Sequence, residues 1–159
     1  MTEAPGHETP PSMAAVQEMI VAEMAELDDP LRKYEYLVSL GRTLEDAGDS
    51  IRQQDHAVPG CQSQVWIRAR LQDGRLRLQA DSDAMITRGI VALLLRVLDG
   101  RTPAEILDAD LFFLDRTGLQ AHLSPSRANG LANMVRQIRK RAEAAAGEGP
   151  TPENRGLPE

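Results

Sequence analysis

The sequence predicts an α+β fold, in which a small antiparallel sheet is packed by helices that come before and after it. Apolar residues recur at helical spacing up to about residue 46, side chains alternate over residues 65–80, and helical spacing returns from residue 84. Strands grouped between helices in this way favour α+β over a doubly wound sheet. The 159 residues, 42% of them hydrophobic, suffice for one domain with a buried core.

Two helices are expected before the sheet. The first begins at Ser12 and carries apolar residues at helical spacing: Val16, Met19, Ile20, Met24 and Leu27. Asp29 is a suitable N-cap for the second helix, and Pro30 suits its first position. That helix is expected to reach about Asp46, with one apolar face: Leu31, Tyr34, Leu37, Val38 and Leu44.

The sheet is expected to be a hairpin. Apolar and polar residues alternate from Val65 to Leu71 and again from Leu76 to Ala80. Between the two runs stands Asp73-Gly74, a dipeptide typical of two-residue hairpin turns. One face of the hairpin should therefore lie on the core, while the other presents arginine and glutamine side chains to water.

Three helices are expected after the hairpin. We expect Asp81, Ser82 and Asp83 to cap a helix over residues 84–98 that is apolar nearly all round and therefore central. Residues 102–105 (TPAE) form a capping box that opens a short helix. Ser124-Pro125 begins the last helix, whose apolar residues continue at helical spacing to Ala142.

The polar, proline-rich residues 1–12 and the glycine- and proline-containing residues 147–159 are predicted to be disordered tails around a domain at 13–146. The formal net charge of −6 disfavours broad binding to nucleic acid or to anionic membranes. We find no signal-peptide core or apolar membrane-spanning stretch, and the single cysteine cannot form an internal disulfide. These features together predict a cytoplasmic protein.

The single cysteine, Cys61, follows Gly60 in a loop just before the first strand. A thiolate there can attack the terminal sulfur of a donor persulfide, a transfer that needs no metal, cofactor or second cysteine. On the residues alone, a small buried side chain is an equally good interpretation, because free cysteines are usually buried. A zinc site or an iron–sulfur cluster needs more ligands than one cysteine and three widely spaced histidines supply. Pairing of Cys61 with His56 or His122 stays open.

Three segments resemble the SufE family, the sulfur acceptors that partner SufS-type cysteine desulfurases. The resemblance lies in residues 60–67 (GCQSQVWI), in residues 81–84 (DSDA) and in residues 120–127 (QAHLSPSR) followed by Gly130-Leu131. In the right order, it extends from about Val16 to Ala142. The resemblance implies a SufE/IscU-like fold. The chain's single cysteine is unlike the several cysteines of U-type cluster scaffolds and implies a carrier.

The resemblance further implies what the residues do. Cys61 would accept persulfide sulfur, stimulate the desulfurase, and deliver the sulfur to a downstream scaffold protein for iron–sulfur cluster assembly. Gly60, Gln62, Arg127 and Asp81 are candidate supporting or partner-binding residues; Arg127 would favour the thiolate or help dock the partner. No resident cofactor or metal, and no nucleic-acid or membrane partner, is implied. A CsdE-like branch with a CsdA-type desulfurase fits the same motifs.

A persulfide is labile, so we expect Cys61 to rest in a small, mostly apolar recess and to swing out on a hinge at Pro59-Gly60. Three alternatives remain. The chain could activate a desulfurase allosterically with Cys61 dispensable, or it could be a thiol-dependent enzyme with a small-molecule substrate. It could also bind nucleic acid through the basic residues of the last helix, Arg136, Arg139, Lys140 and Arg141.

Overall fold

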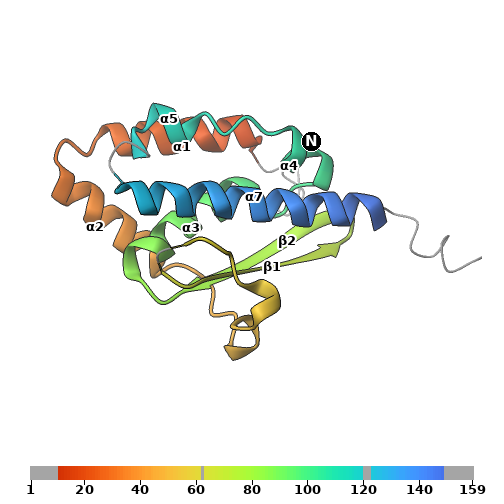
Figure 1. Ribbon diagram of the computed structural model, residues 1–159. Helices are drawn as coiled ribbons and strands as arrows, with labels where there is room; N and C mark the ends of the chain where they lie inside the picture. Colours follow the sequence, from red (N-terminus) through yellow and green to blue (C-terminus); the bar gives the residue numbers. More distant parts are fainter. Residues whose placement is uncertain (1–10, 62, 120–122, 149–159) are drawn as a thin grey trace, which may run out of the picture.

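The computed structural model describes residues 11–61, 63–119 and 123–148, and within them the predicted α+β class is confirmed. The elements before the sheet are helices α1 (Met13–Ala25) and α2 (Pro30–Gly41) and the 3-10 turns η2 (Asp49–Ile51) and η3 (Gln54–His56). The hairpin consists of β1 (Val65–Gln72) and β2 (Arg75–Ser82). Helices α3 (Met85–Leu98), α4 (Pro103–Asp108), α5 (Phe113–Arg116) and α7 (Pro125–Glu148) follow (Figure 1).

The hairpin forms as the alternating pattern predicts. Asp73 and Gly74 both have positive φ, 55° and 78°, which is what a two-residue turn between right-twisted strands requires. The turn sets the register, with Gln72 opposite Arg75. The inner face of both strands is buried, through Val65, Ile67, Leu76, Leu78 and Ala80.

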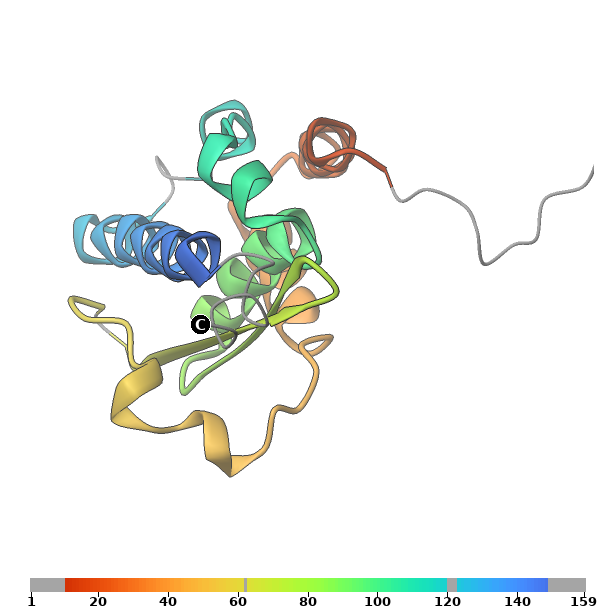
Figure 2. The same cartoon turned by 90° about the vertical axis from the view of Figure 1, so that its right-hand side faces the viewer.

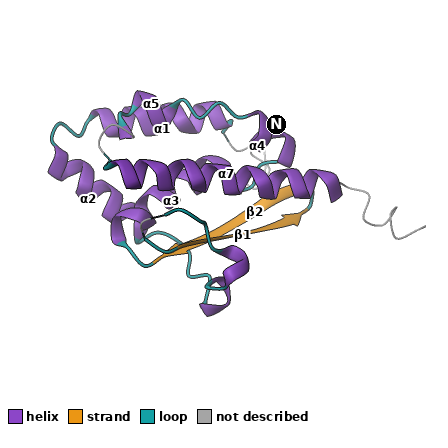
Figure 3. Ribbon diagram, in the orientation of Figure 1, coloured by secondary structure: helices purple, strands orange, loops and turns teal. Residues whose placement is uncertain are grey.

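Helices cover one face of the hairpin (Figures 1 and 3). Helix α3 packs on β2 and α7 packs on β1, while α1 and α5 lie farther out on the same side. The end-on view shows segment 42–57, with η2 and η3, on the opposite side of the sheet (Figure 2). The core lies between the inner face and α3, in which ten of fourteen residues are buried, as the nearly all-round apolar pattern predicts.

Helices α2 and α3 approach each other closely because two glycines face the contact. A Cβ atom on Gly89 would lie 2.0 Å from the carbonyl oxygen of Leu37, and one on Gly41 would lie 2.9 Å from Cβ of Arg88. No larger side chain fits at Gly89 without moving backbone. The close packing fixes the first half of α3, which is the half that contacts the cysteine loop.

Two predicted features of the N-terminal helices are wrong. Helix α2 ends at Gly41, not near Asp46, and Leu31 and Tyr34 are 65% and 51% exposed. The contact with α3 fully buries only Leu37 and Gly41 of α2. Val38 and Leu44 pack partly buried against the core, while Leu31 and Tyr34 lie outside the contact. On α1, Met19 is also exposed, although it shares the helical spacing of buried neighbours.

The end of the hairpin also differs from expectation. Strand β2 continues through Ser82, and the N-cap of α3 is Ala84, which makes no side-chain capping bond. Asp81 and Asp83 are therefore not helix caps. By contrast, the capping box of Thr102 and Glu105 forms as predicted.

Helix α7 includes residues 147 and 148, which the sequence pattern assigns to a tail. The predicted disordered residues 1–10 and 149–159 lie outside the described residues. The domain limits at 13 and 146 stay predictions. Among the helices in the described part of the chain, none has the length and apolar character needed to cross a membrane.

Candidate functional site

The loop before β1 turns back toward α7 and brings Cys61 against it. The loop is tied to the strand by Val58, whose N–H donates to the carbonyl oxygen of Val65 at 2.9 Å. Gly60 has φ of 76°, a conformation that side chains disfavour. A Cβ atom on Gly60 would also lie 2.3 Å from the Asn133 side chain of α7. Glycine at position 60 therefore permits both the turn and the close approach.

Cys61 is half-buried in a small recess between the loop, α3 and α7. The recess has a volume of about 10 Å³, room for roughly one water-sized atom. The residues that line it with Cys61 are Ser63, Thr87, Ile90, Arg127, Gly130 and Met134. The sulfur lies 3.7 Å from the carbonyl oxygen of Gly130, and a Cβ atom at Gly130 would contact Sγ at 3.4 Å. The absence of a side chain at Gly130 thus leaves space beside the sulfur.

Burial raises the pKa of the Cys61 thiol above its ordinary value. The thiol in this conformation is therefore protonated at neutral pH and is a poor nucleophile. The hypothesis that Arg127 favours the thiolate finds no support in this arrangement, because burial is the one cause that shifts the pKa.

Arg127 nevertheless lines the recess, and its Nε atom is buried without a hydrogen-bond partner in the described part of the chain. Such unsatisfied donors are rare in folded proteins, because leaving one buried costs roughly 1–3 kcal/mol. The backbone N–H of Arg127 donates to Oγ of Ser124 at the start of α7, which fixes the position of the residue. Arg127 therefore places in the wall of the recess a cationic side chain whose Nε–H has no partner among the described residues.

An apolar groove adjoins the recess and shares Arg127 with it. The groove has a volume of about 120 Å³, and its lining is mainly apolar: Met24, Pro30, Lys33, Tyr34, Leu37, Ile86, Leu119, Leu123 and Arg127. Tyr34 and two large apolar residues close in sequence to the lining, Leu31 and Met85, are exposed. Tyr34 thus gives this mainly apolar groove an exposed aromatic wall, a feature typical of interaction surfaces.

The other predicted site residues are placed differently. Gln62 lies outside the described residues. Asp81 does not line the recess: it is buried and accepts hydrogen bonds from Nη2 of Arg52 at 2.8 Å and from Nη1 of Arg88. Because Arg88 follows Thr87 in α3, this ion-pair network anchors the helical turn that carries a wall of the recess.

Three lining residues were not singled out from the sequence. Thr87 had a weak signal, since it is a polar residue inside a nearly continuous apolar helix. Ile90 and Met134 had none, since core residues show the same helical spacing. His56 does not line the recess, and its Nδ1 lies 2.9 Å from the carbonyl oxygen of Ile51, while His122 lies outside the described residues. No three His, Cys, Asp or Glu side chains in the described segments are grouped to hold a metal.

Comparison with known proteins places this geometry in a family. The model of the SufE family, described as an Fe–S metabolism associated domain, matches residues 18–142. A SufE-like protein of Synechocystis is 41% identical over 135 residues, which cover 85% of this chain and 82% of that protein. SufE-like protein 1, chloroplastic/mitochondrial, of Arabidopsis thaliana is 39% identical over 139 residues.

That match covers 87% of this chain but 36% of the Arabidopsis protein, so the chain spans about a third of this longer relative. The fold has a solved counterpart in the solution structure of a hypothetical protein from Thermus thermophilus, with a TM-score of 0.69 and 19% identity. The superposition covers 83% of this chain and 96% of the other. The family model and the two relatives establish that this chain belongs to the SufE family, whose domain is associated with Fe–S metabolism.

Proposed function

We propose that this protein accepts sulfur as a persulfide on Cys61 from a cysteine desulfurase, stimulates that enzyme, and delivers the sulfur for iron–sulfur cluster assembly. The observation that carries the proposal is the position of the chain's single cysteine, at the end of a glycine turn and in a recess with room for about one further atom. A persulfide adds one sulfur atom to Sγ. We expect the recess, with small adjustments of its lining, to shelter that atom between encounters.

The transfer needs only the two sulfur groups. The Cys61 thiolate attacks the terminal sulfur of the persulfide on the desulfurase cysteine, and a new S–S bond forms to Sγ as the donor S–S bond breaks. The electron pair of the broken bond leaves on the donor sulfur as a thiolate, and the proton stays on the transferred sulfur. Charge balances, and no external oxidant or reductant is consumed.

Burial of Cys61 lowers the reactivity of its thiol. This supports a mechanism in which the loop moves before sulfur transfer. In the recess the raised pKa keeps the thiol protonated and protects it from oxidants. Swinging out on the hinge at Pro59-Gly60 would return Cys61 to water, where the thiolate forms more readily. Arg127 lines the recess, and its Nε–H has no partner among the described residues, so we expect this side chain to donate to the anion of a bound persulfide.

The apolar groove beside the recess is the surface we propose for desulfurase docking. Tyr34 and the neighbouring Leu31 and Met85 are exposed, and the groove shares Arg127 with the recess. A partner side chain bound there would be close to the loop that must open.

The redox chemistry of Cys61 also bears on the cellular compartment. The Cys61 thiol must stay reduced in order to accept sulfur. This requirement fits a reducing compartment, and we propose the cytoplasm. The Arabidopsis relative is named as chloroplastic/mitochondrial, so members of the family are not confined to one compartment.

Desulfurase turnover tests the proposal against its main alternative. Alanine production by a SufS-type desulfurase should rise when wild-type protein is added, and this stimulation should be lost with Cys61→Ser. Ser63→Ala, which changes another recess residue, serves as the control and should retain most of the stimulation. Full stimulation by Cys61→Ser would instead support an allosteric activator in which the thiol is dispensable.

A further inference from the structure

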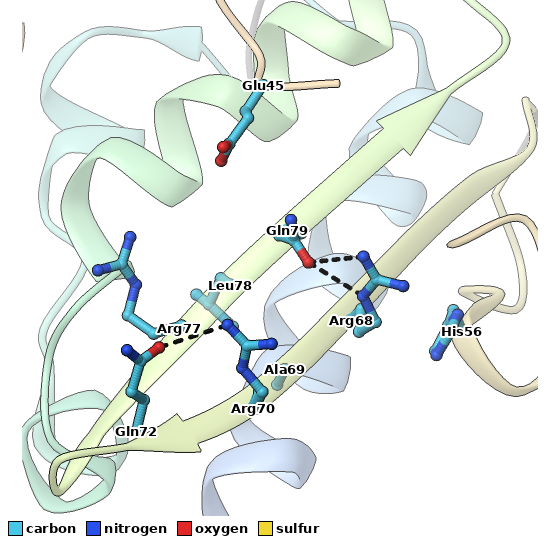
Figure 4. A pocket seen from close by; sticks show the side chains of 9 residues that line it. All are labelled: Glu45, His56, Arg68, Ala69, Arg70, Gln72, Arg77, Leu78 and Gln79. Carbon is cyan, nitrogen blue, oxygen red and sulfur yellow. Dashed lines mark hydrogen bonds between the residues drawn. The ribbon is translucent and has the colours of Figure 1, made fainter. Parts of the chain in front are cut away.

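A further hollow, distinct from the recess and the apolar groove, lies on the outer face of the hairpin (Figure 4). It has a volume of about 650 Å³, and the residues that line it are mostly polar: Glu45, His56, Arg68, Ala69, Arg70, Gln72, Arg77, Leu78 and Gln79. It shares no residue with the Cys61 recess or with the apolar groove. Three arginines therefore converge on one face of a chain whose net charge is −6.

The arginines of this face differ in the number of hydrogen bonds that hold their guanidinium groups. Arg68 is held by the amide oxygen of Gln79 at 2.7 and 3.0 Å and by Oγ of Ser50 at 3.0 Å. Arg70 is exposed, and its Nη2 donates a 3.3 Å hydrogen bond to the neutral side-chain amide oxygen of Gln72. Within the described residues, neither guanidinium has a carboxylate partner.

Arg70 stands directly opposite Arg77 in the register of the two strands. Like charges directly opposite each other destabilise a hairpin, since their Cβ atoms are roughly 5 Å apart. Among the described residues, the carboxylate that Arg77 reaches is that of Asp99, at 3.4 Å, and the Arg77 side chain remains 53% exposed. The pair thus costs stability in the free protein, and a carboxylate placed between the two guanidinium groups would relieve that cost.

We propose that this arginine face, Arg68, Arg70 and Arg77, docks an acidic segment of a partner protein, with carboxylates of the segment bound at Arg70 and Arg77. The planar fork of arginine suits bidentate binding of carboxylates. A single-stranded nucleic acid fits less well, because none of the described residues that line the hollow is a Phe, Tyr or Trp that could stack on bases. Since the recess lies on the helical side of the sheet, Cys61 stays accessible to a desulfurase while this face is occupied.

Fluorescence polarisation with a labelled peptide of alternating glutamate and serine tests the proposal on the full chain. Arg70→Gln/Arg77→Gln should weaken binding about tenfold at low ionic strength, because two charge-assisted contacts are removed. The matched control, Arg136→Gln/Lys140→Gln, removes the same charge from α7 across the sheet and should change affinity less than twofold. Glu45→Gln should strengthen binding, because Glu45 faces the hollow (Figure 4) and repels the peptide.

Several results would overturn the proposal. They are no binding of the glutamate peptide, equal binding of a glutamine peptide, or equal losses in the two double variants. Tighter binding of an oligothymidylate that the Arg70/Arg77 variant abolishes would assign the face to nucleic acid instead. Sulfur loading of Cys61 should be unchanged in Arg70→Gln/Arg77→Gln, so failure here and failure of the persulfide proposal are separate outcomes.

Discussion

The two sides of the hairpin follow different physical rules. On the helical side, atoms are closely packed, the recess at Cys61 holds about 10 Å³, and burial sets the protonation of the thiol. On the outer side, a hollow of about 650 Å³ is floored by charged side chains that are only partly paired. The helical side should therefore respond to changes in side-chain volume, while the outer side should respond to changes in charge.

The largest effect should come from added volume where α2 meets α3. Gly89→Ala places a methyl group 2.0 Å from the Leu37 carbonyl oxygen, and because this is backbone the two helices must separate. We expect a loss of about 3 kcal/mol in unfolding free energy, measured by urea denaturation. Gly147→Ala, where nothing lies within 4 Å, is the control and should leave stability nearly unchanged.

The second-largest loss of stability should come from the buried ion-pair network of Asp81. Asp81→Asn keeps the shape but removes the charge that pairs with Arg52 and Arg88, and we expect a loss of about 2 kcal/mol. The partly exposed guanidinium groups keep the effect below that of a fully buried pair. Asp83 is exposed and accepts one hydrogen bond from the Gln64 N–H, so Asp83→Asn should lose less unfolding free energy. Equal losses would show that the ion pairs of Asp81 stabilise the fold no more than this single hydrogen bond.

Volume in the recess should control the reactivity of Cys61. Gly130→Val adds a branched side chain against the sulfur, so the loop should open and alkylation by iodoacetamide should become about tenfold faster. Gly130→Ala adds a methyl group at an ordinary contact distance of 3.4 Å and should react like the wild type. Unchanged reactivity in Gly130→Val would mean that the recess does not limit access to the thiol.

Alkylation should also report the raised pKa of Cys61. Only the thiolate reacts, so the rate should keep increasing with pH beyond the ordinary pKa of a free thiol. In urea-unfolded protein, where burial is lost, the same titration should move to lower pH. A midpoint that is equal in the folded and unfolded chain would contradict burial as the cause.

The smallest effect should come from charge on the outer face. Arg70→Gln/Arg77→Gln removes the like-charged pair, and thermal unfolding should show a stability gain of roughly 0.2–1 kcal/mol. Added salt should reduce this gain, because it screens exposed charges. A marked loss of stability would mean that the two arginines hold the hairpin together.

Prediction from sequence succeeded where local rules dominate. The Asp73-Gly74 turn and the capping box at Thr102 depend on neighbouring residues, and both form as predicted. It failed for Asp81, because the choice between capping α3 and pairing with Arg52 is decided by a residue 29 positions away. The lining of the recess by Thr87 and Met134 was equally hidden, since it depends on how α3 and α7 meet the loop.

The most direct test is the intact mass of the protein after incubation with a SufS-type desulfurase and cysteine, without reductant. Wild-type protein and Arg70→Gln/Arg77→Gln should each gain one sulfur atom, and Cys61→Ser should gain none. A gain on Cys61→Ser would place the sulfur elsewhere. No gain on the wild type, with an active desulfurase whose turnover is stimulated, would contradict the persulfide carrier and leave an allosteric activator.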